Sequence, residues 1–192
     1  MKVIGLAGRA GSGKSAVARY LARKPTVEWI DLDAVAWDTY TLGTAVYEHL
    51  LAAFGKEILG ESGEIDRIRL AEAAFANHEN RETLNSIVHP AVSDAVGVII
   101  REHRQKGTEI LLIEGALLAS SRYVDRSAYD LVLWLDVPDD VRAKRLQTIG
   151  RGGHGKRGNQ MLPSGNFISI PAGGTIEEVG NCIQRTIDNE LG

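Results

Sequence analysis

The sequence predicts an α/β fold in which a mostly parallel, five-stranded sheet is covered by helices in a three-layer α/β/α arrangement. Short runs such as LLI (111–113) and LVLWL (131–135) are continuously apolar, which is typical of strands that helices cover on both faces. Amphipathic stretches at helical spacing separate these runs, and such alternation indicates parallel strands joined by crossover helices. The expected strands are 3–7, 27–31, 109–114, 130–136 and 166–170.

A glycine-rich motif directly follows the first expected strand. Gly8, Gly13, Lys14 and Ser15 form G-x-x-x-x-G-K-S, and KSAVARYLAR continues the chain as a helix. Glycines let successive backbone amides converge on an anion at a helix N-terminus, Lys14 adds a charge for the β- and γ-phosphates, and the Ser15 hydroxyl suits Mg²⁺. The motif predicts a fold of the P-loop NTPase type; the alternative is a glycine-rich turn without a ligand. The residues expected to bind the nucleotide are Gly8, Gly11, Ser12, Gly13, Lys14, Ser15 and Ala16.

The chain length and the helix start and stop signals indicate a single domain, residues 1–192, with a helical insertion at 33–107. With 192 residues of which 44% are hydrophobic, the chain can bury one substantial core. Within the insertion, Asp66 is expected to cap a helix over RIRLAEAAFANH, Pro90 to open a helix that runs to Gln105, and Gly107 to end it.

Charge and composition narrow the function classes. The formal net charge of −3 gives no general attraction to nucleic acid or to anionic membranes, and no apolar run approaches the length of a membrane span. The single cysteine, Cys182, excludes an internal disulfide, and no Cys or His pair has zinc-site spacing. We expect a soluble cytoplasmic protein, a monomer or weak homo-oligomer, whose partner is a small molecule.

Five motifs follow one another in a fixed order over residues 3–146: IGLAGRAGSGKS, IDLDAVAW, FGKEIL with ESGEIDRIRLAEAAF, LNSIVHP, and IEGALL followed by DLVLWLDVPDDVRAKRL. In this order they resemble the dephospho-CoA kinase family, which transfers the γ-phosphate of ATP to the ribose 3′-hydroxyl of dephospho-CoA in the last step of coenzyme A synthesis. The resemblance implies ATP and Mg²⁺ as cofactors and dephospho-CoA as the substrate.

Carboxylates at the ends of strands are the candidate catalytic and metal-binding groups. Asp33 follows the second strand at the edge where open parallel sheets bind ligands, and it would accept a hydrogen bond from the attacking hydroxyl. Its alternative role is to cap a helix that begins at Ala34; Asp31, pointing to the other side of the strand, ranks second. Glu114 would hold a water on Mg²⁺, or would join a hydrogen-bond network at its strand end.

The resemblance also implies roles outside the phosphate loop. It places Arg69 and His89 in the acceptor site, although a solvated helix charge and a packing residue before proline are the respective alternatives. It places Arg145 at the transferring phosphate and a lid at 145–165, with Arg151, Lys156, Arg157 and Gln160. The glycine-rich GRGGHGKRG departs from the amphipathic helix that forms such a lid elsewhere.

Two other functions remain open at this point. A phosphate loop and a lid do not name the acceptor, so another ATP-dependent nucleoside, nucleotide or metabolite kinase fits the same motifs. A nucleotide-binding regulator that transfers no phosphate is the alternative from another class.

Overall fold

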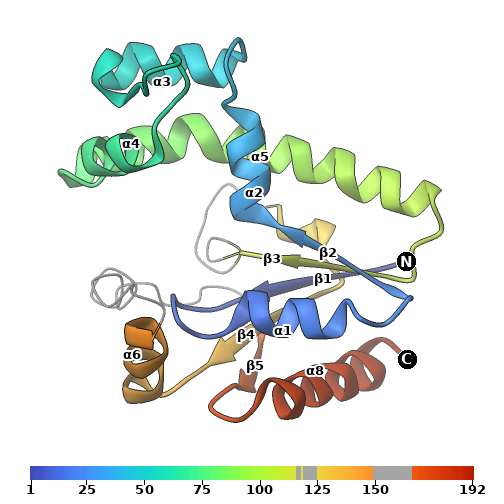
Figure 1. The fold of residues 1–192 in the computed structure, drawn as a ribbon. Helices are drawn as coiled ribbons and strands as arrows, with labels where there is room; N and C mark the ends of the chain where they lie inside the picture. The colour runs from blue at the N-terminus through green and yellow to red at the C-terminus, as the bar shows by residue number, and fades with distance from the viewer. Residues whose placement is uncertain (116–117, 119–124, 149–165) are drawn as a thin grey trace. The chain divides into compact units, whose positions relative to one another are not determined.

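The computed structural model describes residues 1–115, 118, 125–148 and 166–192 (Figure 1). The chain divides into two compact units. Residues 1–31 and 100–192 form the sheet unit, and residues 32–99 form the helical unit, which corresponds to most of the expected insertion.

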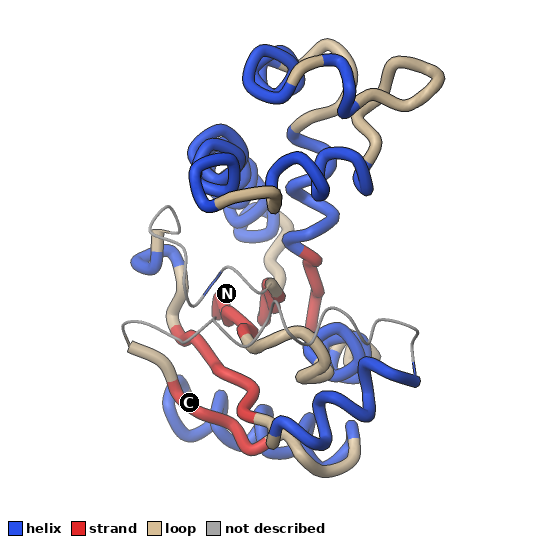
Figure 2. Tube along the Cα trace, turned by 90° about the vertical axis from the view of Figure 1, so that its left-hand side faces the viewer, coloured by secondary structure: helices blue, strands red, loops and turns tan. Residues whose placement is uncertain are grey.

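The sheet unit is built on five strands, and every pairing between them is parallel. Figure 2 shows the strands as red segments. The expected strands are confirmed, and the sheet that the sequence predicts as mostly parallel is parallel throughout. In spatial order the strands are β2 (Val27–Asp31), β3 (Ile110–Glu114), β1 (Lys2–Ala7), β4 (Leu131–Asp136) and β5 (Ile168–Pro171).

The register of the sheet brings three strand ends to one edge. Leu6, near the end of β1, lies opposite Glu114, and Glu114 in turn lies opposite Asp31 of β2. The Gly115 amide continues this pairing by donating to the Leu6 carbonyl at 3.1 Å. Because the strands are parallel, the turns that follow β1 and β3 leave the sheet at the same edge.

Helices α1 (Lys14–Leu21) and α8 (Ile176–Leu191) form the core of the sheet unit together with one face of the strands. The helices contribute apolar side chains at helical spacing, and the strands contribute alternate residues. The fully or nearly fully buried members include Ile4, Leu6, Leu112, Leu133, Leu135, Val17, Leu21, Val179, Ile183 and Ile187. Alternate strand residues such as Val3, Leu111 and Ile113 are also inaccessible, so the sheet is covered on both faces.

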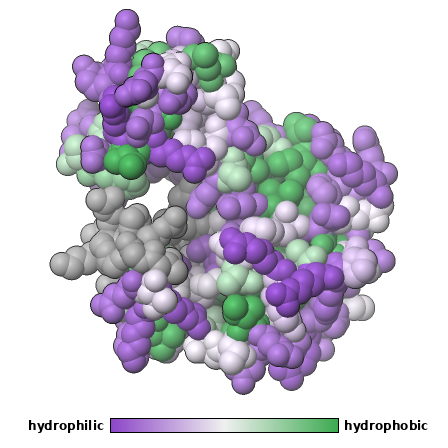
Figure 3. Space-filling view, viewed as in Figure 1, coloured by the Kyte–Doolittle hydropathy of each residue, from purple (hydrophilic) through white to green (hydrophobic). Residues whose placement is uncertain are grey.

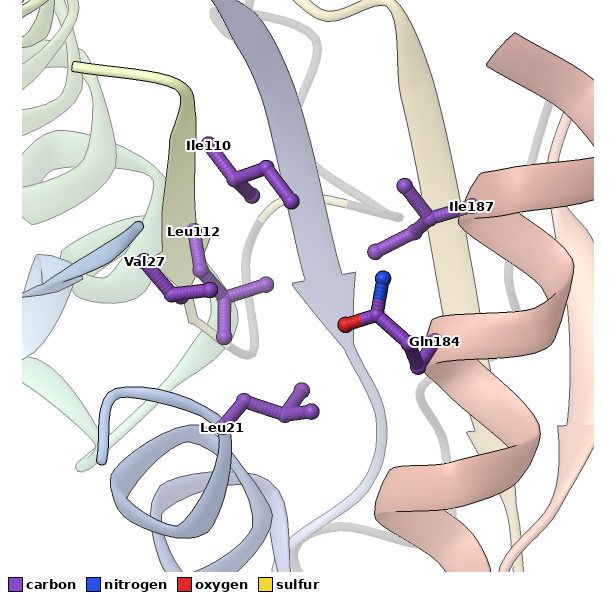
Figure 4. Close-up of a pocket in the computed structure, with 6 residues that line it drawn as sticks. All are labelled: Leu21, Val27, Ile110, Leu112, Gln184 and Ile187. Atoms are coloured by element: carbon purple, nitrogen blue, oxygen red, sulfur yellow. The ribbon is translucent and has the colours of Figure 1, made fainter. Parts of the chain in front are cut away.

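A small apolar gap remains between α1, α8 and strands β2 and β3 (Figure 4). Its free space is about 10 Å³, which is the space of one water molecule. Gln184 borders the gap, but its amide already accepts from Lys24 Nζ and donates to Asp188 at 2.9 Å each. The gap is therefore a packing defect of the core and is far too small for a nucleotide.

The helical unit begins where β2 ends. Asp66 caps α4 (Arg67–Ala74) as predicted, since its carboxylate accepts from the amides of Ile68 and Arg69. The predicted helix over RIRLAEAAFANH is shorter than expected and ends at Ala74. The unit contains α2 (Leu32–Thr39), α3 (Ala45–Phe54), the 3₁₀ turn η1 (Lys56–Ile58), α4 (Arg67–Ala74) and most of α5 (His78–Gln105); η3 (Arg126–Ala128) and α6 (Asp139–Thr148) belong to the sheet unit.

Pro90 does not open a helix, so that prediction is wrong: α5 runs unbroken from His78 to Gln105 with Pro90 inside it. A proline inside a helix removes one backbone hydrogen bond and costs about 3 kcal/mol in helix stability. The real start is set by Asn77, whose side chain accepts from the Asn80 amide at 2.8 Å. Gly107, with a φ of 75°, follows the helix end as predicted.

Helix α5 is long and apolar enough to cross a membrane by length and composition. Its buried residues Val88, Val92, Val96 and Ile100 recur every four positions, whereas Asp94 is exposed. This is the pattern of a helix with one face in a protein core, and long core helices share the composition of membrane spans. Figure 3 shows hydrophilic residues over most of the face in view, with hydrophobic residues in patches between them.

The capping box of α8 generates a prediction about acid stability. The Thr175 amide donates to the Glu178 carboxylate at 2.8 Å, and this bond lowers the pKa of Glu178. A lowered pKa contributes stability above the ordinary range of about 4.3, which is lost as pH falls through the lowered value. We expect Glu178→Gln to lower the urea midpoint at pH 7, and this loss should shrink as the pH falls through the lowered pKa of Glu178, because the carboxylate of the unaltered protein then also loses its charge.

Glu177→Gln is the matched control, because it removes the same charge from the same exposed turn. A stabilising role of the Glu178 charge would be refuted if urea denaturation followed by circular dichroism gave equal midpoint losses for both variants at pH 7, since glutamine keeps an oxygen that can accept from the Thr175 amide.

Candidate functional site

The loop between β1 and α1 has a backbone that only glycine accommodates at several positions. Gly8, Gly11 and Gly13 have φ values of 156°, 80° and 92°. A Cβ on Gly8 would lie 2.7 Å from Ser12 Oγ, and one on Gly11 would lie 2.8 Å from Leu146 Cγ. Gly8 and Gly11 are therefore required by both conformation and space, whereas Gly13 is required by its conformation alone, and the alternation of glycines predicted this loop correctly.

The loop leads directly into α1, whose N-terminus has no capping side chain. Gly13 is the N-cap residue and has no side chain to accept from the helix amides. The first intrahelical bond is from Val17 N to Gly13 O, so the Ser15 and Ala16 amides precede the first available helical acceptor. An N-terminus of this kind favours a bound anion.

Charged and polar side chains of the loop complete this anion site. Lys14 Nζ donates to the Gly8 carbonyl at 2.9 Å, which folds the ammonium group back along the loop. Ser12 is 1% exposed, and its Oγ has no hydrogen-bond partner within the described part of the chain. Glycine-lined backbone, an uncapped helix start, a lysine and a buried hydroxyl fit the phosphates of a nucleotide.

Arg145 connects the phosphate loop to neighbouring elements by hydrogen bonds. Its guanidinium donates to the carbonyls of Ser12 (3.3 Å), Ala172 (3.1 Å) and Gly174 (3.1 Å). These bonds join α6 to the phosphate loop and to the turn between β5 and α8. The predicted role of Arg145 at the transferring phosphate stays a prediction, with this anchoring as an observed second role.

Glu114 occupies the predicted place at the carboxyl edge of the sheet. It is only 3% exposed, and it lies in register with Leu6, two residues before Gly8. Within the described residues no group of three or more His, Cys, Asp or Glu side chains gathers as a metal site. Mg²⁺ in phosphate sites uses one or two protein ligands and completes its shell with phosphates and water, so Ser15 and Glu114 fit that chemistry.

In the helical unit, Asp33 lies in the first turn of α2 and does not cap it, because α2 already begins at Leu32. The same helix carries Trp37, and Tyr40 directly follows its last residue; the two ring centroids are 5.0 Å apart. The Arg67 guanidinium lies over the Trp37 ring, 3.1 Å from its centroid. Burial raises the pKa of Tyr40 to about 12, with Arg67 opposing and Asp33 adding to the shift.

The two other predicted acceptor residues have different surroundings. Arg69 is exposed, and its guanidinium donates to the Leu59 carbonyl of the same unit. His89 is 9% exposed and lies in the middle of α5. The predicted lid residues Arg151, Lys156, Arg157 and Gln160 lie outside the described residues.

Sequence reasoning missed two arginines that shape these sites. Arg142 is 3% exposed and bonds both Asp139 and the phosphate loop, and Arg67 stacks on Trp37. The only sequence signal for Arg142 is the i, i+3 spacing from Asp139 at the start of a helix, which is common for solvated charges. Arg67 follows a predicted N-cap and carries no signal of its own.

Comparison with the sequences of known proteins gives matches to one family. The model of the dephospho-CoA kinase family matches residues 2–154. The dephospho-CoA kinase of Thermobifida fusca is 37% identical over 152 residues, which cover 79% of this chain and 73% of that protein.

Solved structures are similar along the whole chain. The structure of TT1252 from Thermus thermophilus superposes with a TM-score of 0.76 at 24% identity, covering 100% of this chain and 98% of that one. Dephospho-CoA kinase from Campylobacter jejuni gives a TM-score of 0.64 at 16% identity, covering 98% and 97%. At these identities the solved structures establish the fold alone. The family model and the 37% identical relative establish the family: the chain belongs to the dephospho-CoA kinase family.

Proposed function

We propose that the protein is a dephospho-CoA kinase that transfers the γ-phosphate of ATP to the ribose 3′-hydroxyl of dephospho-CoA. The observation that carries the proposal is the phosphate loop, whose glycine geometry and uncapped helix start suit a triphosphate, in a chain of this family. As a kinase, the protein is a phosphotransferase with an alcohol group as acceptor.

The loop residues neutralise charge and orient the triphosphate. Phosphoryl transfer through a loose transition state depends on in-line positioning and on stabilising the charge of the phosphoryl oxygens. Amides at the start of α1 would donate to phosphate oxygens, and Lys14 would exchange its bond to the Gly8 carbonyl for the β- and γ-phosphates. Because these donors are fixed by the backbone, they need little reorganisation when the nucleotide binds.

Magnesium is the second part of the proposal. Ser15 would ligate the ion through its hydroxyl, and Glu114, buried at the neighbouring strand end, would hold one of its waters. When bound, Mg²⁺ would offset the charge that builds on the phosphate oxygens during transfer.

Asp33 is the proposed partner of the acceptor hydroxyl. Its carboxylate stands in the first turn of α2, two residues beyond the end of β2. A carboxylate at this position would accept a hydrogen bond from the hydroxyl of the acceptor and direct the hydroxyl oxygen towards the γ-phosphate. Asp31 is the second candidate, and Arg69 and His89 are proposed to contact the rest of the acceptor.

The remaining proposals concern the setting of the enzyme. We place it in the cytoplasm as a monomer or weak homo-oligomer, with no nucleic acid or membrane partner, and with a lid at 145–165. A kinase for another metabolite is the alternative within the same chemistry, because the acceptor pocket has no diagnostic spacing. A nucleotide-binding regulator would bind ATP without transfer.

The first prediction about the function concerns the acceptor. With ATP and Mg²⁺, coupled turnover should be selective for dephospho-CoA over adenosine, AMP and no acceptor, and a chelator should abolish it. Preference for adenosine or AMP would identify a different kinase, and ATP binding without turnover on any acceptor would identify a regulator.

The second prediction concerns Asp33. Asp33→Asn should retain ATP affinity but reduce kcat by about 10²- to 10⁴-fold, the range for a positioned acid–base group. Asp38→Asn is the control, because Asp38 is an exposed carboxylate on the same helix. Turnover of Asp33→Asn equal to that of Asp38→Asn would remove Asp33 from the mechanism.

The third prediction concerns Lys14. Lys14→Ala should weaken ATP binding and lower kcat/KM together, because the ammonium group interacts with the phosphates in both the bound and the transition state. Isothermal titration with ATP and steady-state kinetics measure the two effects. An unchanged ATP affinity would contradict the phosphate-binding role of the loop.

A further inference from the structure

The first half of the phosphate loop is tied to the start of α6 by a closed ring of polar contacts. Arg9, a loop residue, pairs with Asp139 Oδ1 at 2.9 Å. The same oxygen accepts from Arg142 Nη2 at 3.0 Å, and Arg142 Nη1 donates to the Ala10 carbonyl at 3.2 Å. The peptide bond between Arg9 and Ala10 closes the ring, so the loop is held through both a side chain and its backbone.

The ring is buried on the side of the loop and exposed on the side of Asp139. The Arg142 side chain is 4% exposed, that of Arg9 20%, and that of Asp139 63%. Burying a guanidinium is costly unless it is paired and hydrogen-bonded, and Arg142 has both kinds of partner. Its stem also fills the space beside Gly11, since a Cβ on Gly11 would lie 2.9 Å from Arg142 Cγ.

We propose that Asp139 and Arg142 are positioning residues that hold the phosphate loop in its anion-binding shape before the nucleotide arrives. The Ala10 carbonyl accepts from Arg142 and is therefore directed towards α6. This proposal rests on the proposed function only in taking ATP as the ligand of the loop.

Removing Asp139 distinguishes a positioning role from a purely electrostatic effect on ATP binding. A carboxylate near a triphosphate site repels the ligand, so its removal should strengthen ATP binding if charge alone mattered. A positioning role predicts the opposite result, because Arg9 and Arg142 lose their shared acceptor. The hydrogen bond from Arg142 is the main cause that lowers the pKa of Asp139, in keeping with a carboxylate that is charged throughout the neutral range.

The test compares Asp139→Ala with Asp140→Ala. Asp140 is the next residue of the same helix, is exposed, and carries the same charge, so the pair differs in the ring contacts. We expect Asp139→Ala to raise the Kd for ATP about fivefold, equivalent to about 1 kcal/mol, by isothermal titration without acceptor. Asp140→Ala should bind ATP as tightly as the unaltered protein, or more tightly.

A second pair tests Arg142 on the same helix. Arg142→Met keeps the stem beside Gly11 but removes the donors, and Lys144→Met removes an equal charge from an exposed position. Arg142→Met should raise KM for ATP about tenfold with kcat within about twofold, because loop shape affects ground and transition states alike. Amide hydrogen exchange over residues 8–13 should be faster in Arg142→Met and Asp139→Ala than in their controls.

Two results would overturn the proposal: ATP affinity of Asp139→Ala equal to that of Asp140→Ala, or loop exchange in the ring variants equal to that in the controls. A purely stabilising role would lower the urea midpoint without changing ATP affinity or exchange at the loop, and so would also overturn it. Failure of the proposed function has a different signature, since ATP would bind and the variants would still differ, but dephospho-CoA would not be phosphorylated.

Discussion

The turn from β1 into α1 is the constraint on which the rest of the sheet unit depends. Side chains have no room there: a Cβ on Gly8 would meet Ser12, and one on Gly11 would meet Leu146 and Arg142. The backbone itself therefore packs against α6, and its amides are left to face a ligand. Arg145 extends the same contact to the carbonyls of Ala172 and Gly174, so one helix braces both the phosphate loop and the turn before α8.

The residues with proposed roles are found in both units of the chain. Residues that suit the triphosphate and its metal, such as Lys14, Ser15 and Glu114, belong to the sheet unit, whose strands hold them in register. The proposed acceptor residues Asp33 and His89 belong to the helical unit. Asp33 is special among these because β2 runs directly into α2, so only one residue separates it from the strand.

Much of this arrangement was predictable because it depends on local signals. Apolar runs marked all the strands, and the glycine spacing marked the loop, since both are set by short-range backbone sterics and burial. The prediction that Pro90 opens a helix was wrong because tertiary packing of Val88 and Val92 maintains α5 on both sides of the proline. Arg142 was missed for a different reason: its partner Ala10 is 132 residues away in sequence, and no sequence pattern reports such a contact.

The contacts of Arg145 bear on how an anchoring residue can also meet a phosphate. A guanidinium carries five N–H donors, and the bonds to Ser12, Ala172 and Gly174 use three of them. Its positive charge is not consumed by these carbonyls, because they are neutral acceptors. A guanidinium fixed in this way would present charge to a neighbouring phosphate without losing side-chain entropy on binding, which is the advantage that preorganised electrostatics gives an enzyme.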